Sequence, residues 1–362
     1  MSRFLSDRFA ELDAYVPGEQ PADMEYIKLN TNESPYPPAP GVIKAINEAE
    51  IRKLNLYPNP DAARLLKSLA EFCGMSPENI IAGNGSDELL AFAFLAFCGG
   101  GVAFPDITYG FYPVYARLYG IPYRQIPLKD DFTIEPADYF SAGKNVVIAN
   151  PNAPTGAALP LTDIEAIVKS NREYIVLIDE AYVDFGAESS IPLVREYDNL
   201  LIVHTYSKSR SMAGARLAYA IAQEPLIEDL NKMKYSFNPY NVNRMTQLAG
   251  EAALAEDDYY KDMRREIVKT REYTETRLKA LGFIMTESCA NFVFVKHPAI
   301  GGHELYCALK DRGILVRHFN KPRISDYLRI TIGTNEQMDA LLEAITGIIT
   351  GKGTDNLCEK AK

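Results

Sequence analysis

Short apolar segments recur through the middle of the chain and alternate with longer segments of helical character. The apolar runs are residues 102–104, 146–149, 175–178, 200–203 and 217–222. Runs without polar interruption are typical of strands in a parallel sheet, because both faces of such a sheet are buried. Residues 62–72 show helical spacing instead, with the apolar side chains on one face. We therefore predict an α/β domain with a doubly wound, mostly parallel sheet and a site at the carboxyl ends of its strands.

The two ends of the chain have a different texture. Residues 1–41 are rich in proline and show no sustained periodicity, which predicts an extended arm. A long charged helix is expected over residues 262–281 and a final helix over residues 335–349. The strand-like runs in this part are residues 291–295, 314–316 and 328–332. The predicted organisation is an arm (1–41), a large α/β domain (42–245) and a smaller α+β domain (246–362).

One helix start is predicted from a specific motif. Thr162 and Glu165 have the spacing of a capping box, in which each side chain bonds the backbone N–H of the other residue. This pair predicts that a connecting helix begins next to Thr162.

Composition excludes several classes of protein. At 362 residues the chain is long enough for two domains, and its net charge of −10, without a basic block, argues against nucleic-acid binding. The five cysteines are spread without a CxxC pair, and the four histidines lack metal-ligand spacing, so we expect free thiols and no metal. The most apolar run, residues 89–98, is far shorter than the ~20 residues of a membrane span. We expect a soluble cytoplasmic protein.

The candidate chemistry centres on a lysine. Lys208 follows the predicted strand 200–203, lies among serine and threonine residues, and precedes Arg216 by eight positions. A lysine at the end of a buried strand is atypical of a solvated surface. A partly desolvated amine can lose its proton near neutral pH and then attack an aldehyde.

Two other segments end or follow predicted strands. Asp179 ends the run 175–178, where a carboxylate points into the ligand-binding crevice, although it can equally cap the next turn. The glycine turn 83–85 opens a helix at Ser86, where free backbone N–H groups attract a phosphate. A plain turn with Ser86 as N-cap is the alternative. The turn is not a dinucleotide motif, because Glu88 occupies the third glycine position.

Four further residues have weaker support. Tyr109 lies in a loop after a predicted strand and can stack on a flat ring, or it can simply pack. Asn152 offers an amide from a turn of prolines and glycine that needs no other role. Arg317 and Arg329 lie in apolar runs and need an anionic partner, which is either an internal carboxylate or an acid group of a substrate.

Taken together, these segments resemble the fold type I pyridoxal-phosphate-dependent aminotransferases, and among them the histidinol-phosphate aminotransferase family. The resemblance covers nearly the whole chain, and its most specific parts are residues 15–21, residues 28–33, and Ser207-Lys208 with Arg216. It implies a cytoplasmic, homodimeric transaminase of histidine biosynthesis. The implied substrates are L-histidinol phosphate and 2-oxoglutarate, with imidazole-acetol phosphate and L-glutamate as products and pyridoxal 5′-phosphate as cofactor. It implies no nucleic acid, membrane or metal.

The resemblance also assigns roles to individual residues. Lys208 would be the Schiff-base lysine and proton shuttle, Asp179 the partner of the pyridine nitrogen, and Tyr182 a contact to the ring oxygen. The remaining cofactor contacts would be Ser86, Asp87 through its backbone, Tyr109, Asn152, Ser207, Arg216 and, from a partner subunit, Tyr57. The substrate would be held by Arg317, Arg329, Tyr15 and Asn32.

One position departs from the family pattern. Ala153 stands where many relatives have the asparagine that touches the ring oxygen, so either Asn152 or Tyr182 would supply that contact. Two other readings keep the cofactor but change the reaction, namely an aromatic amino-acid aminotransferase and a threonine-phosphate decarboxylase. A non-catalytic ligand-binding protein on the same fold is the reading from another class.

Overall fold

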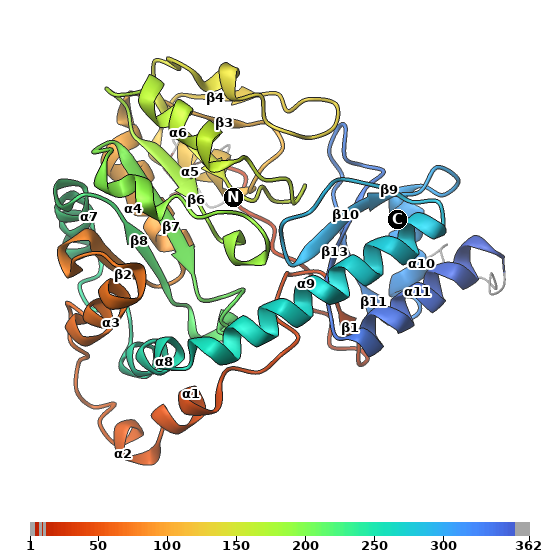
Figure 1. The fold of residues 1–362 in the computed structure, drawn as a ribbon, viewed down its shortest axis with the longest axis horizontal. Coiled ribbons are helices and arrows are strands. Elements are labelled where there is room, and N and C mark those ends of the chain that lie inside the picture. The colour runs from red at the N-terminus through yellow and green to blue at the C-terminus, as the bar shows by residue number, and fades with distance from the viewer. Residues whose placement is uncertain (1–3, 7–8, 10–11, 352–362) are drawn as a thin grey trace.

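A seven-stranded sheet forms the centre of the larger domain in the computed structural model, which describes residues 4–6, 9 and 12–351 (Figure 1). In spatial order the strands are β2 (Ile80–Gly83), β8 (Ala218–Ile221), β7 (Leu200–Thr205), β6 (Val176–Asp179), β5 (Asn145–Ala149), β3 (Val102–Pro105) and β4 (Tyr123–Ile126). All five predicted apolar runs form strands of this sheet, and the predicted α/β class is confirmed.

One strand runs against the others. β8 is antiparallel to both of its neighbours, with Thr205 opposite Ala218, although its apolar run was expected to belong to a parallel set. The reason lies in the connection from β7, which contains only one short 3-10 turn, Ala213–Ala215. A parallel return needs a crossover of a dozen or more residues, usually a helix, whereas an antiparallel return does not. The sheet is therefore mixed at this edge, next to the segment that carries Lys208.

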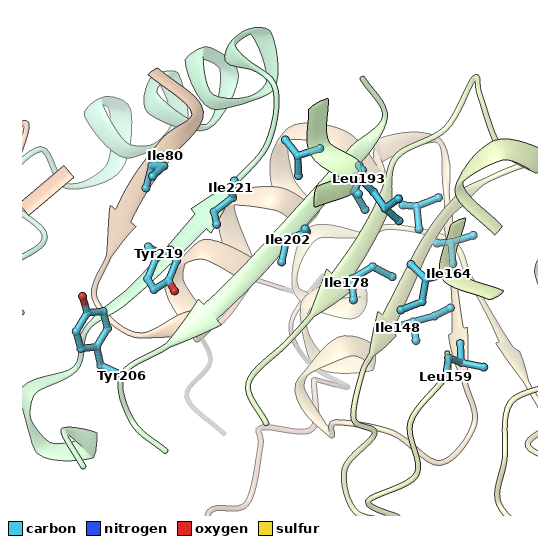
Figure 2. Close-up of a cluster of buried hydrophobic side chains, with 14 of the residues drawn as sticks. Ile80, Ile148, Leu159, Ile164, Ile178, Leu193, Ile202, Tyr206, Tyr219 and Ile221 are labelled. Carbon is cyan, nitrogen blue, oxygen red and sulfur yellow. The ribbon is translucent and has the colours of Figure 1, made fainter. Parts of the chain in front are cut away.

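Helices cover both faces of the sheet. One face packs against α3 (Ala63–Cys73), α6 (Leu161–Ser170) and α8 (Arg244–Ala255), and the other against α4 (Ser86–Phe97), α5 (Phe111–Tyr119) and α7 (Glu224–Phe237). Successive strand residues alternate between the two cores, as with Ile202 and Val203. Figure 2 shows the first core, where Ile148, Ile178 and Ile202 project from adjacent strands.

The smaller domain has its own sheet and core. Its strands, in spatial order, are β12 (Arg317–His318), β13 (Leu328–Thr331), β10 (Phe292–Lys296) and β9 (Ile284–Met285). Helices α10 (Gly302–Lys310) and α11 (Asn335–Ile349) pack on it, and α9 (Asp257–Ala280) runs from the larger domain to the smaller one (Figure 1). The final helix has the predicted bounds, and α9 begins five residues before its predicted start.

The N-terminal segment pairs with a strand of the smaller domain. β1 (Ile27–Lys28) pairs in parallel with β11 (Ile314–Leu315), so the predicted strand at 314–316 joins the arm and not the four-stranded sheet. Two short helices, α1 (Pro40–Ala45) and α2 (Glu48–Ile51), then lead into α3.

The expected division at residues 245/246 falls inside α8. Ala249 and Ala253 of this helix, and Tyr260 of α9, belong to the core of the larger domain. This packing favours a boundary within α9.

The predicted capping box is wrong. Pro160 is the N-cap of α6, no side chain caps this helix, and Glu165 instead accepts a hydrogen bond from the Tyr197 hydroxyl at 2.6 Å. A capping box does form at α11, where Thr334 and Gln337 bond each other's backbone N–H groups. The N-cap, Pro160, lies two residues before Thr162, so Thr162 lies inside the first turn of α6 and cannot cap it.

Two expected absences concern the described ranges only. Within residues 4–6, 9 and 12–351, no helix is long and apolar enough to cross a bilayer. The same residues hold no cluster of three or more histidine, cysteine or acidic side chains arranged for a metal. Cys358 lies outside the described residues, and Cys73, Cys98 and Cys289 are free thiols.

The two helix starts give a matched test. Thr334→Ala should lower the free energy of unfolding by about 1 kcal/mol, because the cap hydrogen bond is lost. Thr162→Ala should change it by less than about 0.5 kcal/mol, because Thr162 is exposed and caps nothing. Urea titrations of both variants measure the difference; an equal loss would contradict the assigned helix starts.

Candidate active site

A pocket of about 320 Å³ opens at the carboxyl ends of β5, β6 and β7. Such an edge, where parallel strands end and helices begin, is the usual ligand site of an open α/β sheet. The pocket wall brings together eight of the sequence-predicted residues, which are Ser86, Asp87, Tyr109, Asp179, Tyr182, Ser207, Lys208 and Arg216. These side chains come from four separate segments of the chain.

Lys208 projects into this pocket from the loop after β7. Its Nζ donates a hydrogen bond to the backbone oxygen of Thr31 at 3.2 Å and lies 5.8 Å from the ring centre of Tyr182. Burial of the amine, together with the positive charge of Arg329, lowers the pKa of Lys208 to about 8. About a tenth of this amine is therefore uncharged at pH 7, far more than in an exposed lysine.

Asp179 is the last residue of β6 and is almost fully buried. Burial raises the pKa of its carboxyl to about 6, while hydrogen bonds from the Tyr112 hydroxyl at 2.9 Å and the Ala181 N–H at 3.2 Å favour the ionised form. The carboxylate therefore stays mostly charged at pH 7 in a site that would otherwise neutralise it.

The glycine turn before α4 forms a tight cradle with Arg216. A Cβ atom on Gly85 would lie 2.5 Å from Nη2 of Arg216, so only glycine allows this approach. Arg216 itself has a left-handed backbone (φ 53°) and bonds Asp87 through Nη2 at 3.2 Å. Ser86 at the first turn of α4 and Ser207 from the Lys208 loop complete the donors. This set of backbone N–H groups, hydroxyls and one guanidinium suits a phosphate group.

Tyr109 and Tyr182 lie on the pocket wall. The Tyr109 hydroxyl donates to Asp87 at 2.7 Å, and the Tyr182 hydroxyl accepts a hydrogen bond from Nδ2 of Asn32 at 2.9 Å. Asn32 in turn bonds Thr331 of β13. Asn32 therefore lies behind Tyr182 and ties the arm, the pocket and the smaller domain together.

Two expected cofactor contacts, Asn152 and Tyr57, are not in the pocket wall. The amide of Asn152 is used by its own loop, donating to Ile107 O and Thr155 Oγ1 and accepting from Thr108, and the pocket is lined by Ala153 instead. The Tyr57 ring is 77% exposed and stacks on Tyr240, away from the pocket of its own chain.

The two arginines of the smaller domain differ from each other. Both terminal nitrogens of Arg317 donate to the arm, to the backbone oxygens of Pro17 and Val16. Arg329 donates to Asn30 O at 2.9 Å, while its Nε is buried without a partner, and no carboxylate of the described residues pairs with it. Arg329 therefore lacks an anionic partner among the described residues, whereas Arg317 binds the arm.

Tyr15 of the arm covers the same region. Its ring stacks on Phe111 with centroids 4.2 Å apart and lies 6.1 Å from the Tyr109 ring. The arginines and Tyr15 interact electrostatically, since the positive charges of Arg329 and Arg317 oppose the rise in the pKa of Tyr15 that its burial causes. The arm thus forms a wall of aromatic character over the substrate side.

Sequence reasoning missed three residues of this site. Tyr112 supports Asp179, Thr31 accepts from Lys208, and Glu33 lines the pocket while paired with Lys28 at 2.8 Å. Thr31 and Glu33 lie in the segment 28–33 that carried the family resemblance, so a signal existed for them. Tyr112 had none, because it is one of 22 tyrosines.

The pocket fits pyridoxal phosphate on its own chemistry. It offers on one wall a carboxylate that stays mostly charged, a phosphate cradle and an amine with a lowered pKa.

Known proteins were compared with the chain. The family model of class I and II aminotransferases matches residues 24–345. The histidinol-phosphate aminotransferase of Brachyspira hyodysenteriae is 50% identical over 352 residues, covering 96% of this chain and 99% of that protein. That of a Marinomonas species is 52% identical over 350 residues, covering 95% and 99%.

Solved structures agree on the fold. The histidinol-phosphate aminotransferase of Sinorhizobium meliloti in complex with pyridoxal-5′-phosphate has a TM-score of 0.85 at 24% identity, covering 97% of this chain and all of that one. An L-threonine-O-3-phosphate decarboxylase of Porphyromonas gingivalis has a TM-score of 0.77 at 20% identity, covering 90% and 99%, so shape alone does not separate the two reactions. The family match and the half-identical relatives do: the chain belongs to the class I and II aminotransferases, among the histidinol-phosphate aminotransferases.

Proposed function

We propose that this protein transfers an amino group between L-histidinol phosphate and 2-oxoglutarate, with pyridoxal 5′-phosphate held at Lys208. The observation that carries the cofactor proposal is that Lys208 and Asp179 line the same pocket, where burial shifts their pKa values to about 8 and about 6. The choice of substrate is supported by about half identity, over almost the full length, to proteins named for that reaction.

The residues of the pocket wall would have separate roles toward the cofactor. When bound, pyridoxal phosphate supplies an aldehyde that accepts the amino group and a ring that withdraws electrons from the reacting carbon. Asp179 would hold the proton on the ring nitrogen, and Tyr182 would donate its hydroxyl hydrogen to the ring oxygen. Ser86, Ser207 and Arg216 would bind the phosphate.

Lys208 would move protons at the substrate carbon that bears the amino group. Its amine must be uncharged to accept a proton, and the fraction in that form rises as pH increases through about 8. Arg329 is the second cause of the lowered pKa after burial, so the substrate-side charge also tunes the amine.

Arg329 would bind the acid group of the substrate. Its buried Nε lacks a partner, and a carboxylate or phosphate oxygen can accept from it without removing any existing contact of Arg329. Arg317 would bind the substrate after breaking its hydrogen bonds to Pro17 O and Val16 O, or would act indirectly by holding the arm in place. Tyr15 would cover the bound molecule.

A substrate panel tests the proposal. Purified protein with 2-oxoglutarate should convert L-histidinol phosphate with a higher kcat/KM than phenylalanine, and should release no carbon dioxide from threonine phosphate. Lys208→Ala should abolish the transfer, and borohydride should fix the cofactor onto Lys208 of the unaltered protein only. A preference for phenylalanine or threonine phosphate would contradict the assignment of L-histidinol phosphate as the substrate. Full activity of Lys208→Ala would contradict the role of Lys208.

The Tyr112 contact gives a prediction with a defined direction in pH. Its hydroxyl lowers the pKa of Asp179 against the effect of burial, so Tyr112→Phe should let that pKa rise. Activity requires the ionised carboxylate, so its acid limb should move to higher pH by about one unit, the worth of a hydrogen bond to a charge. A pH profile of kcat/KM measures this shift.

Tyr115→Phe is the matched control, because Tyr115 is on the same helix and bonds the backbone oxygen of Asp87 at 3.0 Å. Its acid limb should stay in place. Equal profiles for the two variants would remove the role of Tyr112.

We further propose a homodimer in which Tyr57 reaches the cofactor phosphate of the partner subunit. Leu54 and Leu56, close to it in the chain, are exposed apolar side chains, as are Tyr240 and Phe237 at the end of α7 and beyond. The Tyr57 and Tyr240 rings stack at 4.4 Å, and Arg244 bonds the Tyr57 backbone oxygen, so these segments lie together. An exposed apolar group of this kind is typical of a subunit interface.

Coexpression of two inactive variants tests the shared site. Lys208→Ala and Tyr57→Ala chains should each be weak alone, while the coexpressed population should recover about one quarter of wild-type activity. Random assortment makes half of the dimers mixed, each with one complete site. Sedimentation must show a dimer; a monomer, or no recovery in proven mixed dimers, would contradict the proposal.

We propose a cytoplasmic location. The free thiols Cys73, Cys98 and Cys289 suit a reducing compartment.

A further inference from the structure

We propose that a second, basic groove between α9 and the larger domain binds a small polyanion that carries phosphate or carboxylate groups. The groove has a volume of about 960 Å³. One wall is the face of α9 that carries Lys261, Arg264 and Val268, and the other is the segment Val183–Ala187 after β6. It is separate from the active-site pocket, with which it shares only Thr205.

The charge of the groove is opposite to that of the protein. Its lining holds two carboxylates, Asp184 and Glu272, in a chain whose net charge is −10. Against them stand six basic side chains, which are Arg210, Lys261, Arg264, Arg265, Lys269 and Arg271. A hollow lined by one sign of charge concentrates ions of the other sign.

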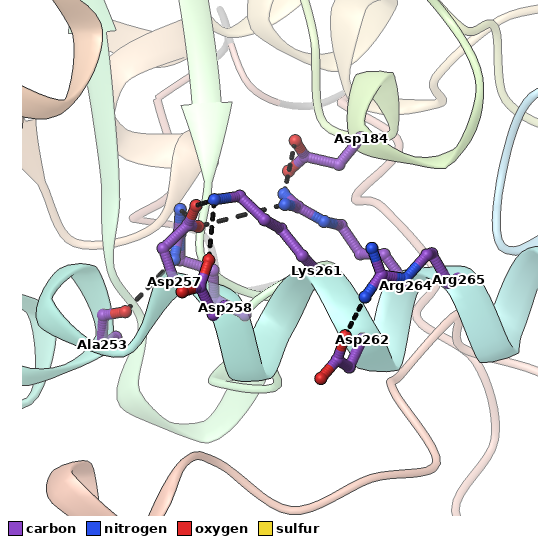
Figure 3. Close-up of polar contacts among 9 residues, drawn as sticks. Asp184, Ala253, Asp257, Asp258, Lys261, Asp262, Arg264 and Arg265 are labelled. Atoms are coloured by element: carbon purple, nitrogen blue, oxygen red, sulfur yellow. Dashed lines mark hydrogen bonds and ion pairs between the residues drawn. The ribbon is translucent and has the colours of Figure 1, made fainter.

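Some of these cations are structural. Arg210 bonds Asp257 at 2.7 Å, Arg264 bonds Asp184 at 2.9 Å, and Lys261 bonds Asp257 at 3.0 Å (Figure 3). Figure 3 shows these groups in one chain of ion pairs along the start of α9. They hold the shape of the groove and leave the remaining cations to face it.

Arg271 is less well compensated. It is buried and donates to the backbone oxygens of Phe185 and Ala290, at 3.0 and 2.7 Å. Its Nε has no hydrogen-bond partner and forms only a long ion pair with Oε1 of Glu275, at 3.7 Å. A guanidinium cannot lose its charge, so this site favours a nearby anion.

The rim cations are free to turn toward a ligand. Arg265 and Lys269 have side chains 74% and 77% exposed, and each pairs only with an acidic residue one turn away on the same helix. Exposed pairs of this kind contribute little, so a ligand can displace the carboxylates at small cost.

A buried histidine forms part of the groove floor. His204 is 8% exposed, and Nε2 lies 2.8 Å from Oε2 of Glu180. Its other ring nitrogen has no hydrogen-bond partner among the residues that the structure describes, and the residue lines the groove. Burial opposes the charged ring, but the Glu180 carboxylate outweighs it and raises the pKa of His204. In the protonated ring this second nitrogen also carries a hydrogen, which it can donate to an anion.

The groove adjoins the loop of the catalytic lysine. His204, Thr205, Ser209 and Arg210 line it, and they flank Lys208 on both sides in the chain. Ser209 also bonds Asp184, the partner of Arg264. A polyanion bound here would therefore contact the same loop from the side away from the active-site pocket.

Equilibrium binding tests the site. Calorimetric titration of the protein loaded with pyridoxal phosphate should show binding of inorganic pyrophosphate, and a second arm with citrate separates phosphate from carboxylate recognition. The double variant Arg265→Gln, Lys269→Gln should weaken this binding about tenfold or more, because each lost charge-assisted hydrogen bond counts. The double variant Arg52→Gln, Lys232→Gln is the matched control, since both side chains are exposed and paired within one helical turn.

Each outcome decides the proposal. Weakening in the groove variant alone, with binding retained in Arg329→Gln, supports the groove. Absence of binding for both anions, equal weakening in the two double variants, or loss only in Arg329→Gln would overturn it. The binding assay does not depend on which amino donor the enzyme uses, so it can fail while the transaminase proposal stands.

Discussion

Burial of ionisable groups at the carboxyl edge of the central sheet is the constraint on which the rest of the site depends. Asp179 ends β6 and is buried, Lys208 lies in the pocket wall just after β7, and burial moves their pKa values in opposite directions. An amine that gives up its proton more easily and a carboxyl that keeps it more readily are costly to fold. The hydrogen bond from Tyr112 reduces that cost for Asp179, and the charge of Arg329 lowers the pKa of Lys208 further. Residues behind the pocket wall therefore help to set the charges of the two groups.

The site is also where the two domains meet. Asn32 has a left-handed backbone (φ 55°) and connects Tyr182 of the larger domain with Thr331 of the smaller one. Strain of this kind is kept only where the surroundings demand it. The contacts of Asn32 place the arm, the ring-facing tyrosine and the Arg329 strand in one network, which α9 then spans from the outside.

The sequence predicted five of the seven strands of the central sheet, the final helix and eight residues of the pocket wall, because these depend on local pattern. Unbroken apolar runs become strands, and Lys208, Asp179 and Ser86 follow them or open a helix. The failures are residues whose role depends on distant contacts. Tyr112 supports Asp179 across 67 positions of sequence, and Asn152 was expected at the pocket although its amide bonds are spent within its loop and on Ile107 and Thr108. Thr162 failed for a local reason, since Pro160 begins α6 earlier than the motif suggests.

Arg317 grips the arm through the backbone oxygens of Pro17 and Val16, not through their side chains. A backbone oxygen is present whatever the side chain, and Val16 is 71% exposed. Residue 16 can therefore drift to other amino acids without loosening the arm, whereas a change of Arg317 removes both hydrogen bonds at once. The attachment of the arm thus depends on the side chain of Arg317 and not on the side chain of residue 16. Whether two sequences share residue 16 is therefore a poor guide to whether the arm is attached in both.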